Sequence, residues 1–252
     1  SSNSGSHLAV GGVSSEISIL DVDKGWDSVM GIELRGLVPL SAKWHPKDQY
    51  LTVTGQNNSV LAVETTNARH VAGHHLHSIS PILSIEFSPD GRMAIIGNKS
   101  GVVTFFSLAG STFVTAYELV VVLNDKLSIH WSLNGLFTVI GSNDALIIVR
   151  RKVPPKDAAK GSLPSASGFS VRKVIRELGI IRGVSIDPHS QYVAVSGSHT
   201  QILDAHAGFA KVQEFKDGPC LANAWSPDGR WLATIGKEKV LTIYDTGHER
   251  LD

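Results

Sequence analysis

The sequence has 252 residues, 42% hydrophobic and 18% charged, and its 23 Lys and Arg balance 23 Asp and Glu. A chain of this length can bury a core without disulfides, and zero net charge argues against nucleic-acid binding by the whole surface. No apolar run approaches the roughly 20 residues of a spanning helix, so we predict no membrane span. The single cysteine, Cys220, cannot form an internal disulfide, which fits an intracellular protein, cytoplasmic or nuclear.

Short strand-like segments follow a polar start. We expect residues 1–7 to be a flexible N-terminal segment and residues 8–252 to form one domain. Within it, apolar β-formers alternate with polar residues, and turn sequences such as Pro-Asp-Gly separate the runs. The expected groups of strands span residues 8–34, 40–70, 82–119, 127–178, 183–215 and 221–245.

One pattern recurs in these groups: a first strand ends in a turn, a second strand ends in a glycine, and a third strand follows. The first strands end at Trp44, Phe87, Trp131, Ile186 and Trp225, and the closing glycines are Gly12, Gly55, Gly97, Gly141, Gly197 and Gly236. Both landmarks recur about every 40 to 45 residues, apart from one step of about 55. This period predicts an all-β fold, a β-propeller of four-stranded antiparallel blades, with about six blades visible and seven as the alternative for an intact protein.

The sequence resembles the WD40-repeat family over most of its length, most strongly in Ser84–Arg92 and Trp225–Asp245. The repeats are degenerate, because the Trp-Asp pair that gives the family its name is replaced at every third-strand end, and propellers outside the WD40 family are the alternative. The residues at these six ends are Asp21, Glu64, Ser107, Arg150, Asp204 and Asp245. The resemblance implies a non-catalytic protein–protein interaction scaffold, a subunit of a larger complex that binds other proteins on its loop faces.

The first and last blades are incomplete. The first blade has no first strand ahead of residue 8, and too few residues follow Asp245 for an outer strand. Because an open propeller leaves unpaired strand edges, we expect the sequence to be part of a longer protein or to lack disordered segments.

The highest concentration of positive charge lies at the long step, where an insertion at about residues 150–168 separates the third and fourth strands of blade four. Residues 150–176 hold one acid, Asp157, and eight bases: Arg150, Arg151, Lys152, Lys156, Lys160, Arg172, Lys173 and Arg176. These bases are candidates to bind an acidic or phosphorylated protein, with lipid headgroups or RNA as other ligands. The alternative is a solvated loop that binds nothing, which the lack of interleaved aromatic residues favours.

Few residues suggest catalysis or a metal, and we predict no catalytic residue, no cofactor and no metal site. His74, His75 and His77 lie close together in sequence, but no Cys, Asp or Glu cluster at metal-ligand spacing stands beside them. The alternative is a propeller enzyme with an acid/base pair or a metal in its channel. Only Glu86 and His130 on the first strands would serve it.

Turn and loop positions account for most other polar residues. Asp48, Asp90 and Asp228 occupy turns, where a carboxylate commonly accepts hydrogen bonds from local backbone N–H groups. Three tryptophans, at 44, 131 and 225, share one repeat position and are expected to pack in the core. The remaining candidate partner-binding residues lie in an off-register early loop or in loops at the channel entry, and they are Trp26, Lys99, Asn143 and Lys237.

Overall fold

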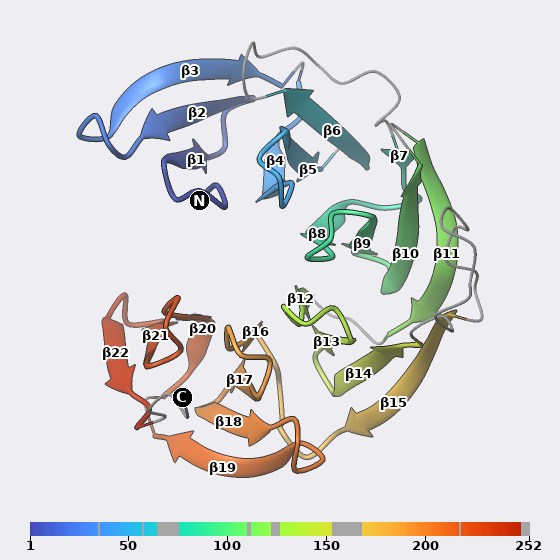
Figure 1. Ribbon diagram of the computed structural model, residues 1–252, viewed down its shortest axis with the longest axis vertical. Helices are drawn as coiled ribbons and strands as arrows, with labels where there is room; N and C mark the ends of the chain where they lie inside the picture. The colour runs from blue at the N-terminus through green and yellow to red at the C-terminus, as the bar shows by residue number, and fades with distance from the viewer. Residues whose placement is uncertain are drawn as a thin grey trace. The chain divides into compact units, whose positions relative to one another are not determined.

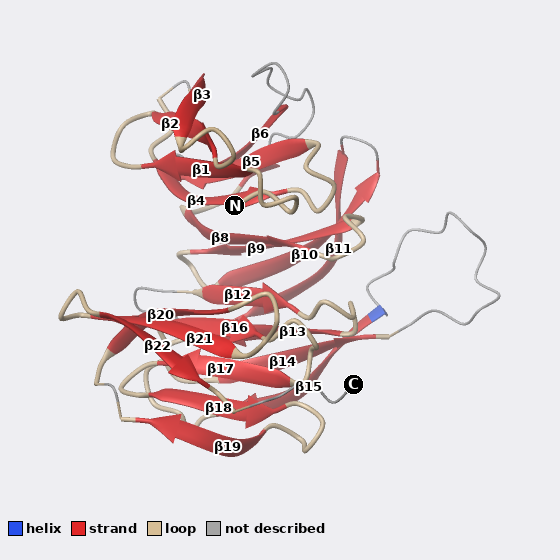
Figure 2. Cartoon of the chain, turned by 60° about the vertical axis from the view of Figure 1, so that its left-hand side comes forward, coloured by secondary structure: helices blue, strands red, loops and turns tan. Residues whose placement is uncertain are grey.

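The computed structural model describes residues 1–34, 36–56, 58–64, 76–109, 112–121, 127–152, 168–216 and 218–247. Antiparallel strands make up nearly all of the regular structure in this part of the chain (Figures 1 and 2). The described residues form two compact units, unit 1 up to Val120 and unit 2 from Val121 onward. None of their helical segments is long and apolar enough to cross a membrane.

Unit 1 contains three sheets, which correspond to predicted blades one to three. Blade one is β1 (His7–Gly11), β2 (Glu16–Asp21) and β3 (Asp27–Glu33). Blade two is β4 (Pro39–Trp44), β5 (Tyr50–Gly55), β6 (Ser59–Glu64) and β7 (Leu76–His77). Blade three is β8 (Ile82–Phe87), β9 (Met93–Asn98), β10 (Val102–Ala109) and β11 (Thr112–Val120).

Unit 2 contains three further sheets, blades four to six. Blade four is β12 (Ser128–Trp131), β13 (Phe137–Gly141), β14 (Leu146–Arg151) and β15 (Phe169–Ile175). Blade five is β16 (Gly183–Ile186), β17 (Tyr192–Ser196), β18 (Thr200–Asp204) and β19 (Ala210–Phe215). Blade six is β20 (Cys220–Trp225), β21 (Trp231–Gly236) and β22 (Leu241–Asp245).

Each sheet is an up-and-down meander in which consecutive strands pair. Among the described residues, blades one and six have three strands and the other blades have four, as the sequence predicts. One predicted boundary is wrong. The outer strand of blade two, β7, lies beyond the expected end at residue 70, because the connection from β6 is longer than the repeat suggests.

Apolar side chains of adjacent blades interlock within each unit. In unit 1 one cluster joins blades one and two and includes Trp44, and a second joins blades two and three around Phe87. In unit 2 blades four and five share a cluster around Val184, and blades five and six share another that Trp225 packs against. Trp131 is only 2% exposed, so the three tryptophans of the shared repeat position do lie at or against the core.

Two of the closing glycines allow the end of a second strand to approach the segment that leads into the first strand of the same blade. A Cβ on Gly55 would clash with the carbonyl oxygen of Val38, and one on Gly197 with that of Ile180. This close backbone approach explains the glycine at these two positions, whereas a Cβ on Gly12 would meet nothing within 4 Å.

Serine and aspartate hold the turns between first and second strands. Ser88 Oγ donates to Asp90 Oδ1 (2.5 Å) and accepts from the backbone N–H of Met93 (3.0 Å). Ser226 and Asp228 repeat this arrangement in blade six, and hydrogen bonding by Ser226 is the main cause that lowers the pKa of Asp228. The predicted turn role is therefore observed at both aspartates.

The third turn aspartate, Asp48, has more distant partners. Its carboxylate accepts from the backbone N–H groups of Asn3 (2.7 Å) and Ser4 (2.9 Å). Ser2 is nearly buried, at 5% exposed. The start of the chain is thus hydrogen-bonded to blade two in this structure, while the flexibility expected of residues 1–7 and the extent of a single domain over 8–252 stay predictions.

Candidate partner-binding site

The basic residues at the start of the predicted insertion belong to the paired strands β14 and β15. Arg150 is in register with Ser170 and Arg151 with Phe169, and the N–H of Lys152 donates to the carbonyl oxygen of Gly168 (2.7 Å). Backbone pairing therefore extends to Lys152 before the insertion and to Gly168 after it. The cations at its base are held by a sheet rather than by a loop.

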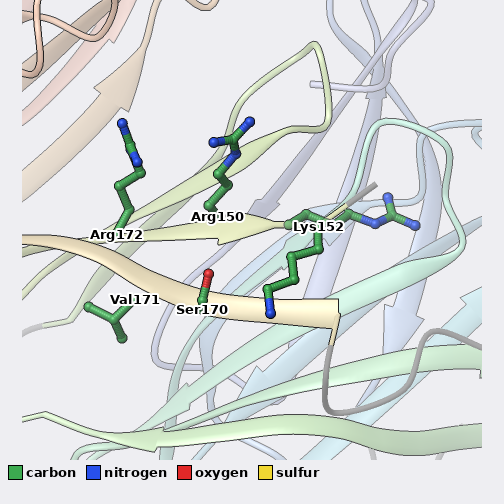
Figure 3. Close-up of a pocket in the computed structure, with 6 residues that line it drawn as sticks. Arg150, Lys152, Ser170, Val171 and Arg172 are labelled. Carbon is green, nitrogen blue, oxygen red and sulfur yellow. The ribbon is translucent and has the colours of Figure 1, made fainter. Parts of the chain in front are cut away.

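A surface hollow of about 480 Å³ lies at this end of blade four. Among the described residues its lining contains four cationic side chains and no carboxylate, and these residues are Arg150, Arg151, Lys152, Ser170, Val171 and Arg172. Figure 3 shows Arg150 and Arg172 projecting to the same side of the two strands, with the Ser170 hydroxyl also on that side. Arg150, Lys152 and Arg172 are solvent-exposed, whereas Arg151 is half-buried. Sequence reasoning missed Ser170 and Val171, which only the register of β15 could have placed here.

The structure separates two of the predicted bases from this hollow. Arg176 Nη1 forms an ion pair with Asp144 Oδ2 at 2.6 Å. Lys173 Nζ donates to the backbone carbonyl oxygen of Gly208 (2.5 Å). Both side chains thus have partners within unit 2. Lys156 and Lys160 lie outside the described residues.

Comparison of the blades shows that Arg150 departs from the repeat. Each third-strand end pairs with the first residue of the second strand, and the pairs are Asp21–His7, Glu64–Tyr50, Ser107–Met93, Arg150–Phe137, Asp204–Tyr192 and Asp245–Trp231. Four of these six positions carry an acid, one a serine and one a base. Blade four therefore reverses the usual charge at this position.

The acids at this position have a structural task. Asp204 Oδ1 accepts from the N–H groups of His206 (2.8 Å) and Ala207 (3.1 Å), which closes the turn after β18. Asp21 closes the turn after β2 in the same way, and its pKa is lowered, first by hydrogen bonding from Lys24. The side chain of an arginine cannot accept hydrogen bonds, so Arg150 cannot close a turn in the way that these aspartates do.

Arg172 occupies a second equivalent position. Each of the four longest outer strands carries one extra residue where its register with the third strand shifts, and these residues are Val29, Ala116, Arg172 and Val212. Such a bulge bends the strand locally. Blade four alone among these four places a charge on it. The two arginines of the hollow are thus both departures from the repeat.

The remaining candidates lie in other loops of the two units. Asn143 follows β13 and precedes β14, whereas Arg150 lies near the other end of β14, roughly 13 Å along the strand from Leu146 at the usual strand rise. Lys99 and Lys237 are exposed at equivalent turns of blades three and six, where their N–H groups donate to the carbonyl oxygens of Pro81 and Pro219. Trp26, in the turn after β2, is 56% exposed.

The residues of the enzymatic alternative have other surroundings. Glu86 Oε2 accepts from Lys43 Nζ at 2.7 Å, and both residues lie on neighbouring first strands. His130 lies on β12 in unit 2. His74 and His75 fall outside the described residues, as does the side chain of His77. In the part of the chain that is described, no group of three or more His, Cys, Asp or Glu residues could hold a metal ion.

No protein-family model matches the chain, and no curated protein matches its sequence. Its fold is nevertheless similar to solved structures over nearly its whole length. The β-propeller domain of Cps50 (Swd1) from Myceliophteria thermophila matches with a TM-score of 0.78 and 14% identity, over 97% of this chain and 81% of that one.

Two further structures are similar to the same extent. A chain of the Mitotic Checkpoint Complex matches with a TM-score of 0.80 and 17% identity, over 97% of this chain and 72% of that one. A chain of Kuenenia stuttgartiensis hydrazine synthase matches with a TM-score of 0.75 and 17% identity, over 98% and 82%. The strand order within the sheets and these similarities confirm the predicted fold class, an all-β propeller of antiparallel blades with about six blades in this chain.

Proposed function

We propose that this chain is a non-catalytic scaffold that binds other proteins, as a WD40-like, intracellular subunit of a multi-subunit complex. The fold supports this role, because packed sheets present surface residues with little reorganisation on binding. Two of the similar structures support it as well, since one is a β-propeller domain and another is a chain of a named complex.

The observation that carries the proposal is the cationic hollow of blade four. Arg150, Lys152 and Arg172 are exposed there, and none of the described residues that line the hollow carries a carboxylate. Charged side chains that close no turn and form no ion pair among the described residues are available to a partner. Lys99, Asn143 and Lys237 each stay a predicted partner contact.

The non-catalytic part of the proposal rests on the environment of Glu86. This carboxylate is 8% exposed and lies 2.7 Å from Lys43 Nζ, so it stabilises the contact between two first strands. A general acid or base needs access to a substrate proton.

The proposal is tested by affinity purification of the chain at 50 and 300 mM salt, with quantitative mass spectrometry of the proteins that co-purify. The test variant replaces Arg150, Arg151 and Lys152 with Ala, and Arg176→Ala is the control because Arg176 already pairs with Asp144. We expect at least one near-stoichiometric partner that the triple variant loses, more clearly at low salt, with nearly unchanged Tm. The proposal would be contradicted if the chain purifies without any partner, or if the wild type and all variants retain the same partner equally.

A further inference from the structure

We propose that the blade-four hollow binds a phosphorylated side chain of a partner protein. This inference rests on the proposed scaffold role and deepens it by naming the chemical group that is recognised. Four features of the described residues support it: the arrangement of the two arginines, their departure from the repeat, the shape of the hollow, and the strand pairing that holds it.

The two arginines suit a tetrahedral dianion. Arg150 and Arg172 project to the same side of β14 and β15, and the Ser170 hydroxyl lies on that side between the two strands (Figure 3). A guanidinium donates two parallel hydrogen bonds to phosphate oxygens, and a hydroxyl can donate a third. Lys152 also lines the hollow, but Figure 3 shows its side chain pointing to the opposite side of the strands from the two guanidinium groups. A phosphate carries more charge and more acceptor oxygens than a carboxylate, so it uses this donor set more fully.

The departure from the repeat argues that these charges have a role outside the fold. At the position of Arg150 four of the other five blades have an acid, and at the position of Arg172 the other three blades with this bulge have Val or Ala. Folding of a blade therefore does not need a base at either place. Two bases at two independent repeat positions nevertheless meet in one hollow.

The shape and composition of the hollow favour a phosphorylated peptide over other polyanions. Its volume of about 480 Å³ falls in the range of small-ligand sites, about 300–1,000 Å³, and suits one modified side chain. None of its described lining residues is aromatic, so these residues offer no surface on which nucleic-acid bases could stack. The formal charge of the whole chain is zero, which gives little long-range attraction to RNA or to an anionic membrane.

Strand pairing fixes most of the lining. Arg150 and Ser170 are register partners, and the hydrogen bond from Lys152 N–H to Gly168 O closes the ladder beyond them. Binding therefore orders side chains but no backbone at these positions, which favours recognition by preformed geometry.

The experiment measures fluorescence anisotropy with the full chain and labelled peptide pools. The pools have degenerate flanks and differ only in a fixed central residue, which is phosphoserine, serine or glutamate. We expect the phosphoserine pool to bind at least about tenfold more tightly than the serine pool, with the glutamate pool between them. A single-stranded RNA oligonucleotide and vesicles containing phosphatidylserine are measured in parallel.

Matched variants locate the site. We expect Arg150→Ala and Arg172→Ala each to weaken binding of the phosphoserine pool about tenfold, and Arg150→Lys to restore it only in part, because lysine lacks the planar pair of donors. Arg176→Ala should leave binding unchanged, because that guanidinium pairs with Asp144. Circular dichroism checks that each variant is folded.

Several outcomes would overturn the inference. Equal affinity for the phosphoserine and serine pools would show that the hollow does not recognise the phosphoryl group. Tighter binding of RNA or vesicles that depends on Arg150 and Arg172 would assign the hollow to that ligand instead, and equal losses in Arg176→Ala would show a nonspecific charge effect. If the affinity purification finds a partner that binds without phosphorylation and the peptide assay shows no preference for phosphoserine, the scaffold role stands and only the phosphate inference is lost.

Discussion

The imidazole of His45 donates from Nε2 to the carbonyl oxygen of Gly91 at 3.2 Å, and so joins the turn of blade two to the turn of blade three. The ring lies between Tyr50 and Phe87, at centroid distances of 4.6 and 5.4 Å, and the residue is only 5% exposed. Unit 2 repeats the contact, since His189 Nε2 lies 3.3 Å from the carbonyl oxygen of Asp228. A histidine in one turn thus contacts the turn of the following blade in both units.

Gly91→Ala should destabilise the protein more than Gly135→Ala. Both glycines have positive φ, +68° and +71°, so each alanine incurs a backbone cost of about 1–2 kcal/mol. A Cβ at position 91 would also lie 2.6 Å from His45 Nε2, whereas nothing lies within 4 Å at position 135. We expect an additional loss of about 1–3 kcal/mol at position 91. Urea unfolding measures both variants, and equal losses would show that His45 yields freely.

The stability contributed by His45 should fall as the pH is lowered. Burial lowers the pKa of His45 below its usual 6.5, with the charge of Lys47 acting in the same direction and the Gly91 hydrogen bond and Asp48 in the other. Because the unfolded chain then takes up the proton more readily, this contribution is fully present above pH 6.5 and is lost below it. Unfolding free energies of wild type and His45→Gln, measured from pH 7.5 to 5.5, should converge as the pH falls. His206→Gln, at an exposed position, is the control. A constant difference would contradict the prediction.

The sequence predicts the blades well because local chemistry determines them. The Ser-Pro-Asp-Gly turns and the closing glycines mark strand ends wherever the turn is short, as they do at Ser88 and Gly55. The end of blade two was misplaced because no such signal marks β7, a strand of two residues.

The sequence predicts the composition of the basic site but not its arrangement. Basic residues that are close together in the sequence have different surroundings in the structure. Arg176 binds Asp144, 32 residues away, and Lys173 binds the carbonyl oxygen of Gly208, 35 residues away. Asp48 lies in the turn that the sequence predicts, but its carboxylate contacts Asn3 and Ser4, which are 45 and 44 residues away. Such long-range contacts leave no periodic signal in the sequence.

Asn223→Ala should weaken the contact between blades five and six. Asn223 Nδ2 donates to Ser196 Oγ (2.6 Å) and to the carbonyl oxygen of Gly183 (3.3 Å), and its Oδ1 accepts from Ser185 Oγ. Ser185 and Ser196 are both buried, and the substitution leaves Ser196 Oγ its longer contact with Thr200 Oγ1 (3.3 Å), so the loss should cost about 1–3 kcal/mol. We expect Tm to fall by about 2–8 °C in calorimetry. Asn143→Ala, in a loop, should change stability by less than about 0.5 kcal/mol. Similar values for the two variants would refute a special role of Asn223.

Lys43→Ala should be more costly than a comparable change in an exposed ion pair. Glu86 is 8% exposed, and removal of Lys43 leaves its carboxylate without the ammonium group at 2.7 Å, at a cost of about 1–3 kcal/mol because Lys43 itself is partly solvated. The control is Lys211→Ala, which breaks the exposed pair with Glu214 and should cost no more than about 1 kcal/mol.

A second substitution separates charge from packing at this contact. Glu86→Gln removes the buried charge, so in the Lys43→Ala background it should recover part of the lost stability. Chemical denaturation of the wild type, the two single variants and the double variant gives the coupling free energy between the two side chains. A coupling near zero would mean that Glu86 is solvated enough to do without Lys43, and the carboxylate would then again be a candidate acid or base for the enzymatic alternative.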